Sequence, residues 1–165
     1  MKSCLVTTLA AIVATRSWTT KRLRDWGDRL LGHVDIPASW VLELSNCSSF
    51  EEADAALSER AKTAGIGLSV DLPYLLAGMW YIQLGEGVLD RARFDVEICE
   101  LLDSMLPFEL AGALDVEEWK SRTYGERELP EDLRLEFDGL AARSRSAMDR
   151  LSTATPSTDE AKLFT

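Results

Sequence analysis

Three carboxylates, Glu97, Glu100 and Asp103, recur at intervals of three residues near the middle of this chain of 165 residues. On a helix, side chains three or four residues apart are neighbours, so these acids could share a cation or raise one another's pKa. Paired acids serve in acid–base catalysis and in metal sites, but both uses need further ligands from another element. A run of charge is more often a solvated or partner-facing surface, and that is the interpretation we prefer.

Other signatures of catalysis are missing from the sequence. His33 is the only histidine, so a catalytic pair with serine or cysteine would depend on one residue that no motif surrounds. The segments Gly65-Ile66-Gly67 and Gly85-Glu86-Gly87 lack the third glycine and the lysine of phosphate-binding loops. We therefore expect no catalysis and no cofactor, and keep a carboxylate-based metal-dependent enzyme as an alternative.

The three cysteines, Cys4, Cys47 and Cys99, are odd in number and form no C-x-x-C pair. A disulfide framework would leave one thiol over, and a zinc site would need ligands that the sequence lacks nearby. Reduced thiols fit a cytoplasmic protein best. The apolar residues 4–14 have the length of a secretory signal but recur at helical spacing, so we favour a core helix and leave a cleaved signal open.

The charge of the chain is acidic and unevenly distributed. The 18 Lys and Arg residues face 28 Asp and Glu residues, for a formal net charge of −10. Residues 1–34 carry +4, residues 35–140 carry −15 and residues 141–165 carry +1. Such a protein repels phosphate backbones and anionic lipids, so we expect neither nucleic acid nor a membrane as its partner. Either a basic N-terminal element packs on an acidic body, or the acidic body faces a cationic partner.

Helical periodicity runs through the chain, and no series of alternating residues with hairpin turns predicts strands. We expect an all-α fold, a single-domain bundle or irregular array of about six to eight helices over residues 1–152. A flexible Ser/Thr-rich tail is predicted for residues 153–165. No apolar run reaches the roughly 20 residues of a transmembrane helix.

Capping residues predict where several helices begin. Thr20 and Asp71 are placed to cap helices, and Ser48 and Ser49 open overlapping capping boxes before an acidic helix. Pro130 favours the first turn of a final helix.

The helices between these caps differ in how apolar they are. Residues 74–84 are apolar almost all round, which predicts a central helix, and a long helix follows over residues 88–106. Residues 108–120 predict one or two short helices. Trp26 and Trp80 lie on apolar faces and are expected in the core, whereas Trp119, among charged neighbours, is expected to be accessible.

The segments LRDWGDRL (residues 23–30) and DIPASWVLELS (residues 35–45) precede an acidic capped helix. This succession, over residues 20–62, resembles small helical bacterial immunity proteins of contact-dependent and polymorphic toxin systems, which neutralise their cognate toxins by tight binding. The resemblance implies an all-α inhibitor without catalysis that associates rapidly with a basic toxin domain. It carries over no contact residues, because such proteins vary most where they touch their toxins.

The predicted binding surface is the stretch from Glu86 to Glu118, which carries ten acidic and two basic residues. Its carboxylates would replace phosphate groups as ligands of Lys and Arg side chains on a partner. The residues expected to contact that partner are Glu97, Glu100, Asp103, Glu109, Asp115, Glu117, Glu118 and Trp119. The leading hypothesis is an inhibitor of a cationic protein. The alternative is a helical regulatory or structural subunit that forms homo-oligomers through an apolar groove.

Overall fold

A computed structural model describes residues 5–33, 35, 38–64, 70–104, 108–110 and 115–153 of the chain. These described residues form eight α-helices and no strand, which confirms the predicted all-α fold. The chain divides into two compact units, a terminal unit of residues 1–69 with 147–165 and a central unit of residues 70–146. The single folding domain over residues 1–152 stays a prediction. The described residues do not include Cys4, Pro37 or the predicted tail from residue 154 onward.

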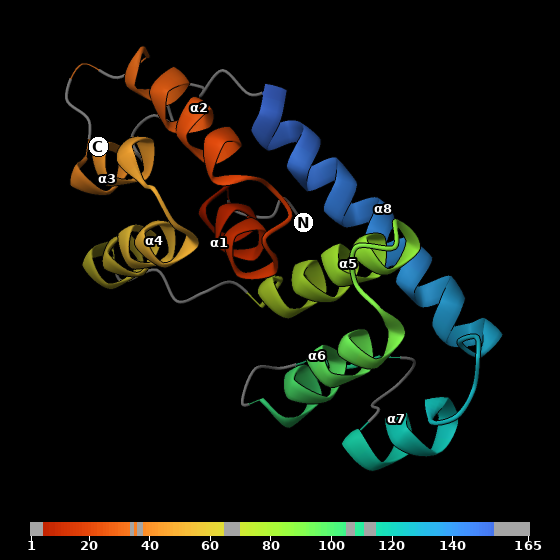
Figure 1. Cartoon of the computed structure of the whole chain (residues 1–165). Helices are drawn as coiled ribbons and strands as arrows, with labels where there is room; N and C mark the ends of the chain where they lie inside the picture. The colour runs from red at the N-terminus through yellow and green to blue at the C-terminus, as the bar shows by residue number, and fades with distance from the viewer. Residues whose placement is uncertain are drawn as a thin grey trace. The chain divides into compact units, whose positions relative to one another are not determined.

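The terminal unit is built from short helices. They are α1 (Leu5–Thr15), α2 (Thr20–Leu31), α3 (Ser39–Asn46), α4 (Phe50–Ala64) and the end of α8 (Glu131–Thr153). Helix α3 packs against both α2 and α4, and α4 packs against α1 (Figure 1). The Trp26 indole is 6% exposed and donates from Nε1 to the Leu151 carbonyl at 3.0 Å, which ties α2 to the end of α8. The predicted core position of Trp26 is thus confirmed.

Two predicted helix starts in the terminal unit have different outcomes. The hydroxyl of Ser49 accepts from the Glu52 N–H at 3.2 Å, so the predicted Ser49–Glu52 capping box before α4 is confirmed in part. Its return bond goes to the Ser48 N–H, at 2.6 Å, and the Ser48 hydroxyl donates to Glu52 and not to Glu51. The cap of α2 is Thr19 and not Thr20, because the Thr19 backbone is extended and its hydroxyl accepts from the Arg22 N–H.

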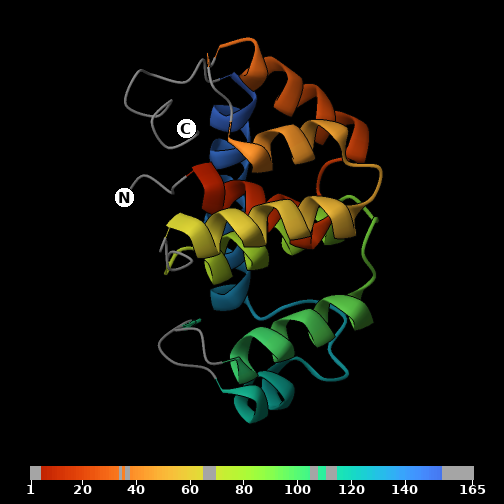
Figure 2. The same ribbon diagram turned by 90° about the vertical axis from the view of Figure 1, so that its left-hand side faces the viewer.

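The central unit contains α5 (Leu72–Gly85), α6 (Arg91–Asp103), α7 (Val116–Thr123) and the first part of α8. Helix α6 lies beside both α5 and α7 (Figure 2). As predicted, α5 is buried along most of its length, with Leu75, Ala77 and Met79 completely buried, while Trp80 is only half-buried. The start of α8 directly after Pro130 is also confirmed.

In the central unit, three helix boundaries and one cap differ from the prediction. Helix α6 begins at Arg91 and not at residue 88, because the Asp90 carboxylate caps it by accepting from the Arg93 N–H at 2.7 Å. Helix α7 continues past Lys120 to Thr123. Asp71 does precede α5, but its carboxylate accepts from Arg143 at 2.5 Å and makes no cap hydrogen bond. The predicted continuation of α6 to residue 106 is wrong, because α6 ends at Asp103 and the Ser104 backbone is extended. The predicted helix end at Gly65 to Gly67 lies outside the described residues.

At Gly78, α5 approaches α8 closely. A Cβ atom added there would lie 2.4 Å from the Leu140 carbonyl oxygen and 2.3 Å from Ser144 Oγ. The buried Ser144 hydroxyl donates to the Leu75 carbonyl at 3.2 Å. Because the obstacle includes backbone, it cannot move aside cheaply, so only glycine allows this contact between the two helices.

We predict that Gly78→Ala destabilises the protein by about 2–3 kcal/mol, because the added methyl group forces α5 away from α8. Gly139→Ala is the matched control: this residue lies within a helix too, α8, but no atom is within 4 Å of its added Cβ. The control should gain about 0.5–1 kcal/mol from the better helix propensity of alanine. Urea unfolding measures both changes, and a Gly78→Ala variant as stable as the wild type would contradict the contact.

Candidate functional site

Four of the predicted carboxylates lie together along a groove of about 530 Å³ between α6 and α7. Glu100 and Asp103 come from α6, and Asp115 and Glu117 come from the beginning of α7. We call these four residues and the space they line the acidic groove. The rest of its lining is Cys99, Leu102, Val116 and Lys120. Four negative charges therefore face one positive charge.

The beginning of α7 is fixed by the groove's own residues. Asp115 Oδ1 accepts from the Glu118 N–H at 2.8 Å, and the acidic first turn suits the positive end of the helix dipole. Lys120 Nζ lies 3.8 Å from Glu117 Oε1, and the two side chains are 55% and 87% exposed. An exposed pair at this distance contributes little, so the Glu117 carboxylate remains available to a partner.

Three predicted acidic residues do not line the groove. Glu97 is ion-paired with Arg93 on α6, and only 14% of its side chain is exposed. Glu109 is exposed and lies in the short described segment between α6 and α7, where its N–H donates to the Tyr74 hydroxyl. Glu118 is exposed on α7. The structure thus brings half of the predicted contact residues to one place.

The prediction that Trp119 is accessible is wrong. This side chain is 1% exposed, and its ring centroid lies 6.2 Å from that of Phe94 and 5.9 Å from that of Phe137, in edge-to-face geometry. The charged neighbours in sequence project from the other faces of α7. Helical spacing was the missed signal, because Trp119 and Thr123 are one turn apart and are both buried.

No relative identifies this chain. Comparison with protein-family models, with curated proteins and with solved structures finds no match to it. None of the helices in the described ranges is long and apolar enough to cross a membrane. Among the described side chains, no three or more His, Cys, Asp or Glu residues are arranged to hold a metal ion.

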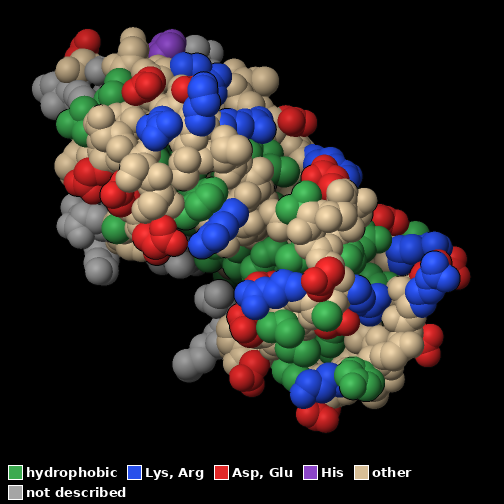
Figure 3. Space-filling view, viewed as in Figure 1, with side chains coloured by type: hydrophobic (Ala, Val, Ile, Leu, Met, Phe, Trp, Pro, Cys, Tyr) green, Lys and Arg blue, Asp and Glu red, His purple; other side chains and the backbone are tan. Residues whose placement is uncertain are grey.

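A second cleft, of about 620 Å³, is not predicted by the sequence analysis. Its distinctive residues are four arginines, Arg91, Arg127, Arg134 and Arg145. Net charge does not reveal such a site. On the face drawn in Figure 3, Lys and Arg side chains lie interspersed with Asp and Glu, so basic groups can be near one another on a protein that is acidic overall. A signal was present on α8, where Arg134, Asp138, Ala141 and Arg145 recur at helical spacing.

Cys99 reports on the electrostatics of the acidic groove. Its thiol is partly buried, and burial raises its pKa above the ordinary value. Lys120 lowers this pKa, whereas Asp95 and Glu117 raise it. Because the thiolate is the nucleophile, a raised pKa slows alkylation at neutral pH.

We predict that Glu117→Gln accelerates alkylation of Cys99 by iodoacetamide at pH 8, because it removes a negative charge that disfavours the thiolate. Lys120→Gln should slow the same reaction, because it removes the charge that favours the thiolate. Peptide mass spectrometry on a Cys4→Ser background measures the rates, with the buried Cys47 thiol as the internal control. Equal rates in both variants would show that these charges do not face Cys99.

Proposed function

We propose that this chain is a binding protein whose acidic groove takes Lys and Arg side chains of a cationic protein partner. The observation that carries the proposal is the lining of the groove, where four carboxylates from α6 and α7 meet one lysine. Carboxylates pair with guanidinium and ammonium groups through short, charge-assisted hydrogen bonds. A groove formed by two helices can hold several such groups at fixed positions.

The charge of the central unit supports the same function. Residues 70–146 carry 17 acidic and eight basic side chains, a net charge of −9. A field of this sign attracts a basic protein and accelerates the encounter, most strongly at low ionic strength. The groove would then fix the orientation of the bound partner, because its carboxylates occupy defined positions on two helices.

We further propose that the partner is inhibited by this contact, in the manner of bacterial immunity proteins. The resemblance to those proteins lies in residues 20–62, within the terminal unit, whereas the acidic groove lies in the central unit. A toxin domain that acts on a phosphate-bearing substrate needs basic side chains in its active site, and carboxylates can take the place of that substrate. The alternative of a subunit with an apolar groove has less support, because charged side chains line both the acidic groove and the second cleft.

The test uses a short capped peptide of Arg, Lys and Gly as the cationic probe. The groove variant combines Glu100→Gln, Asp103→Asn and Glu117→Gln, and keeps Asp115 because it caps α7. The control variant makes the same change in net charge at exposed acids of the terminal unit. It combines Asp28→Asn, Glu43→Gln and Asp54→Asn.

We expect the groove variant to bind the peptide about tenfold more weakly than the wild type, a change of about 1.4 kcal/mol spread over three partly exposed pairs. The control should weaken binding by less than about twofold, because salt screens distant charges. Calorimetric titration measures the affinities, and the peptide should also protect Cys99 from alkylation. Equal weakening in both variants, without protection of Cys99, would mean that the peptide senses net charge alone and would contradict the proposal.

A further inference from the structure

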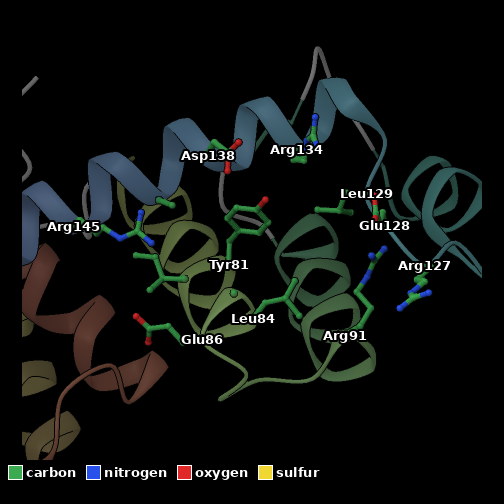
Figure 4. A pocket seen from close by; sticks show the side chains of 13 residues that line it. Tyr81, Leu84, Glu86, Arg91, Arg127, Glu128, Leu129, Arg134, Asp138 and Arg145 are labelled. Atoms are coloured by element: carbon green, nitrogen blue, oxygen red, sulfur yellow. The ribbon is translucent and has the colours of Figure 1, made fainter.

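The arginine-lined cleft of the central unit has no role in the function proposed above. Its floor comes from the end of α5, with Tyr81, Ile82 and Leu84. One wall is α8, and the other combines the start of α6 with the segment 127–129. In Figure 4, Tyr81 points from α5 toward Asp138 on α8, and Arg91 extends from α6 toward the segment that carries Glu128 and Leu129. The volume of about 620 Å³ is that of a site for a small organic molecule.

The charge of this cleft contrasts with that of its surroundings. The central unit carries a net charge of −9, but four of its eight basic residues line this one cleft. They face three acids, Glu86, Glu128 and Asp138, so the lining is net positive. All four basic residues are arginines, whose planar fork of donors matches carboxylate and phosphate oxygens better than the ammonium group of lysine does.

Most of these guanidinium groups have donors to spare. Arg127, Arg134 and Arg145 make no ion pair with any residue that the structure describes. Arg91 donates from Nε to both carboxylate oxygens of Asp95, at 3.0 and 3.1 Å. Its Nη2 atom is buried and finds no hydrogen-bond partner. An unsatisfied buried donor is costly, and a bound anion is one of the few ways to satisfy it.

One of the three acids is already engaged within the cleft. The Tyr81 hydroxyl donates to the Asp138 carboxylate, and Tyr81 itself is held by Phe137, with ring centroids 5.2 Å apart. Burial, together with the Asp138 charge, raises the pKa of Tyr81, so this phenol stays a neutral donor. Glu86 and Glu128 are exposed at the margin.

We propose that this cleft binds a small phosphate monoester, with the phosphate at the Arg91 guanidinium and its carbon body against Tyr81, Leu84 and Leu129. The Arg91 guanidinium has an unsatisfied Nη2 donor, and the charges of the other three arginines along the cleft favour a dianion over a singly charged carboxylate. The apolar part of the floor is too large for a bare ion to cover. The site is separate from the acidic groove in its residues and is opposite to it in charge.

The test titrates the full-length, ¹⁵N-labelled protein with phenyl phosphate at low ionic strength. The variants are Arg134→Gln and Arg145→Gln, and Arg150→Gln is the matched control because this arginine is also exposed on α8 but does not line the cleft. Each cleft variant should weaken binding about threefold or more, because it removes a positive charge that attracts the dianion at low ionic strength, while the control binds as the wild type does. The amide signals of Leu84, Gly85 and Arg91 should shift on binding.

Two smaller probes separate the parts of the ligand. Inorganic phosphate should bind more weakly than phenyl phosphate, because it leaves the apolar floor uncovered, and benzoate should bind more weakly because it carries one charge. Benzoate binding as tightly as phenyl phosphate would overturn the phosphate assignment. Absence of saturable binding, or the same loss in Arg150→Gln as in the cleft variants, would overturn the site itself.

Discussion

The close contact between α5 and α8 at Gly78 is the constraint on which the central unit depends. Since no side chain separates the two helices there, the Gly78 backbone packs directly against Leu140 and Ser144. One turn further along α5, Tyr81 is thereby brought against Phe137 and Asp138. The floor and one wall of the arginine-lined cleft follow from the same crossing, because α5 supplies Tyr81 and Leu84 while α8 supplies Arg134 and Arg145. A larger residue at position 78 would change the separation of floor and wall together.

The aromatic cluster extends this framework from α8 to α6 and α7. Phe137 lies 5.3 Å from Phe94 and 5.9 Å from Trp119, measured between ring centroids. With Phe94 on α6 and Trp119 on α7 turned inward, the carboxylates of those helices remain at the surface and form the acidic groove. The same packing therefore explains why Trp119 is not a contact residue and why its charged neighbours can be. Burial of aromatic surface fixes the helices, and the charged side chains occupy the faces that remain.

The sequence predicts local features of this protein better than the arrangement of its helices. The all-α fold, the capping box at Ser49, the start after Pro130 and the buried α5 follow from periodicity and cap chemistry, which act over a few residues. Trp119 was misplaced because the charge of its neighbours outweighed helical spacing in the prediction. The arginine cleft was missed because its residues come from three helices and a connecting segment, which only tertiary packing brings together. The acidic groove was found in part, since Glu100 and Asp103 are near in sequence to Asp115 and Glu117.

The central unit thus carries two clefts whose linings have opposite net charge, and we propose a different ligand for each. The most direct measurement is one NMR titration in which the full-length protein receives the basic peptide and phenyl phosphate together. We predict that both ligands bind at once, the peptide shifting amides of residues 99–103 and 115–120 and the phosphate ester shifting amides of residues 81–86 and 134–145. Displacement of one ligand by the other, or a single shared set of shifted amides, would contradict the existence of two sites.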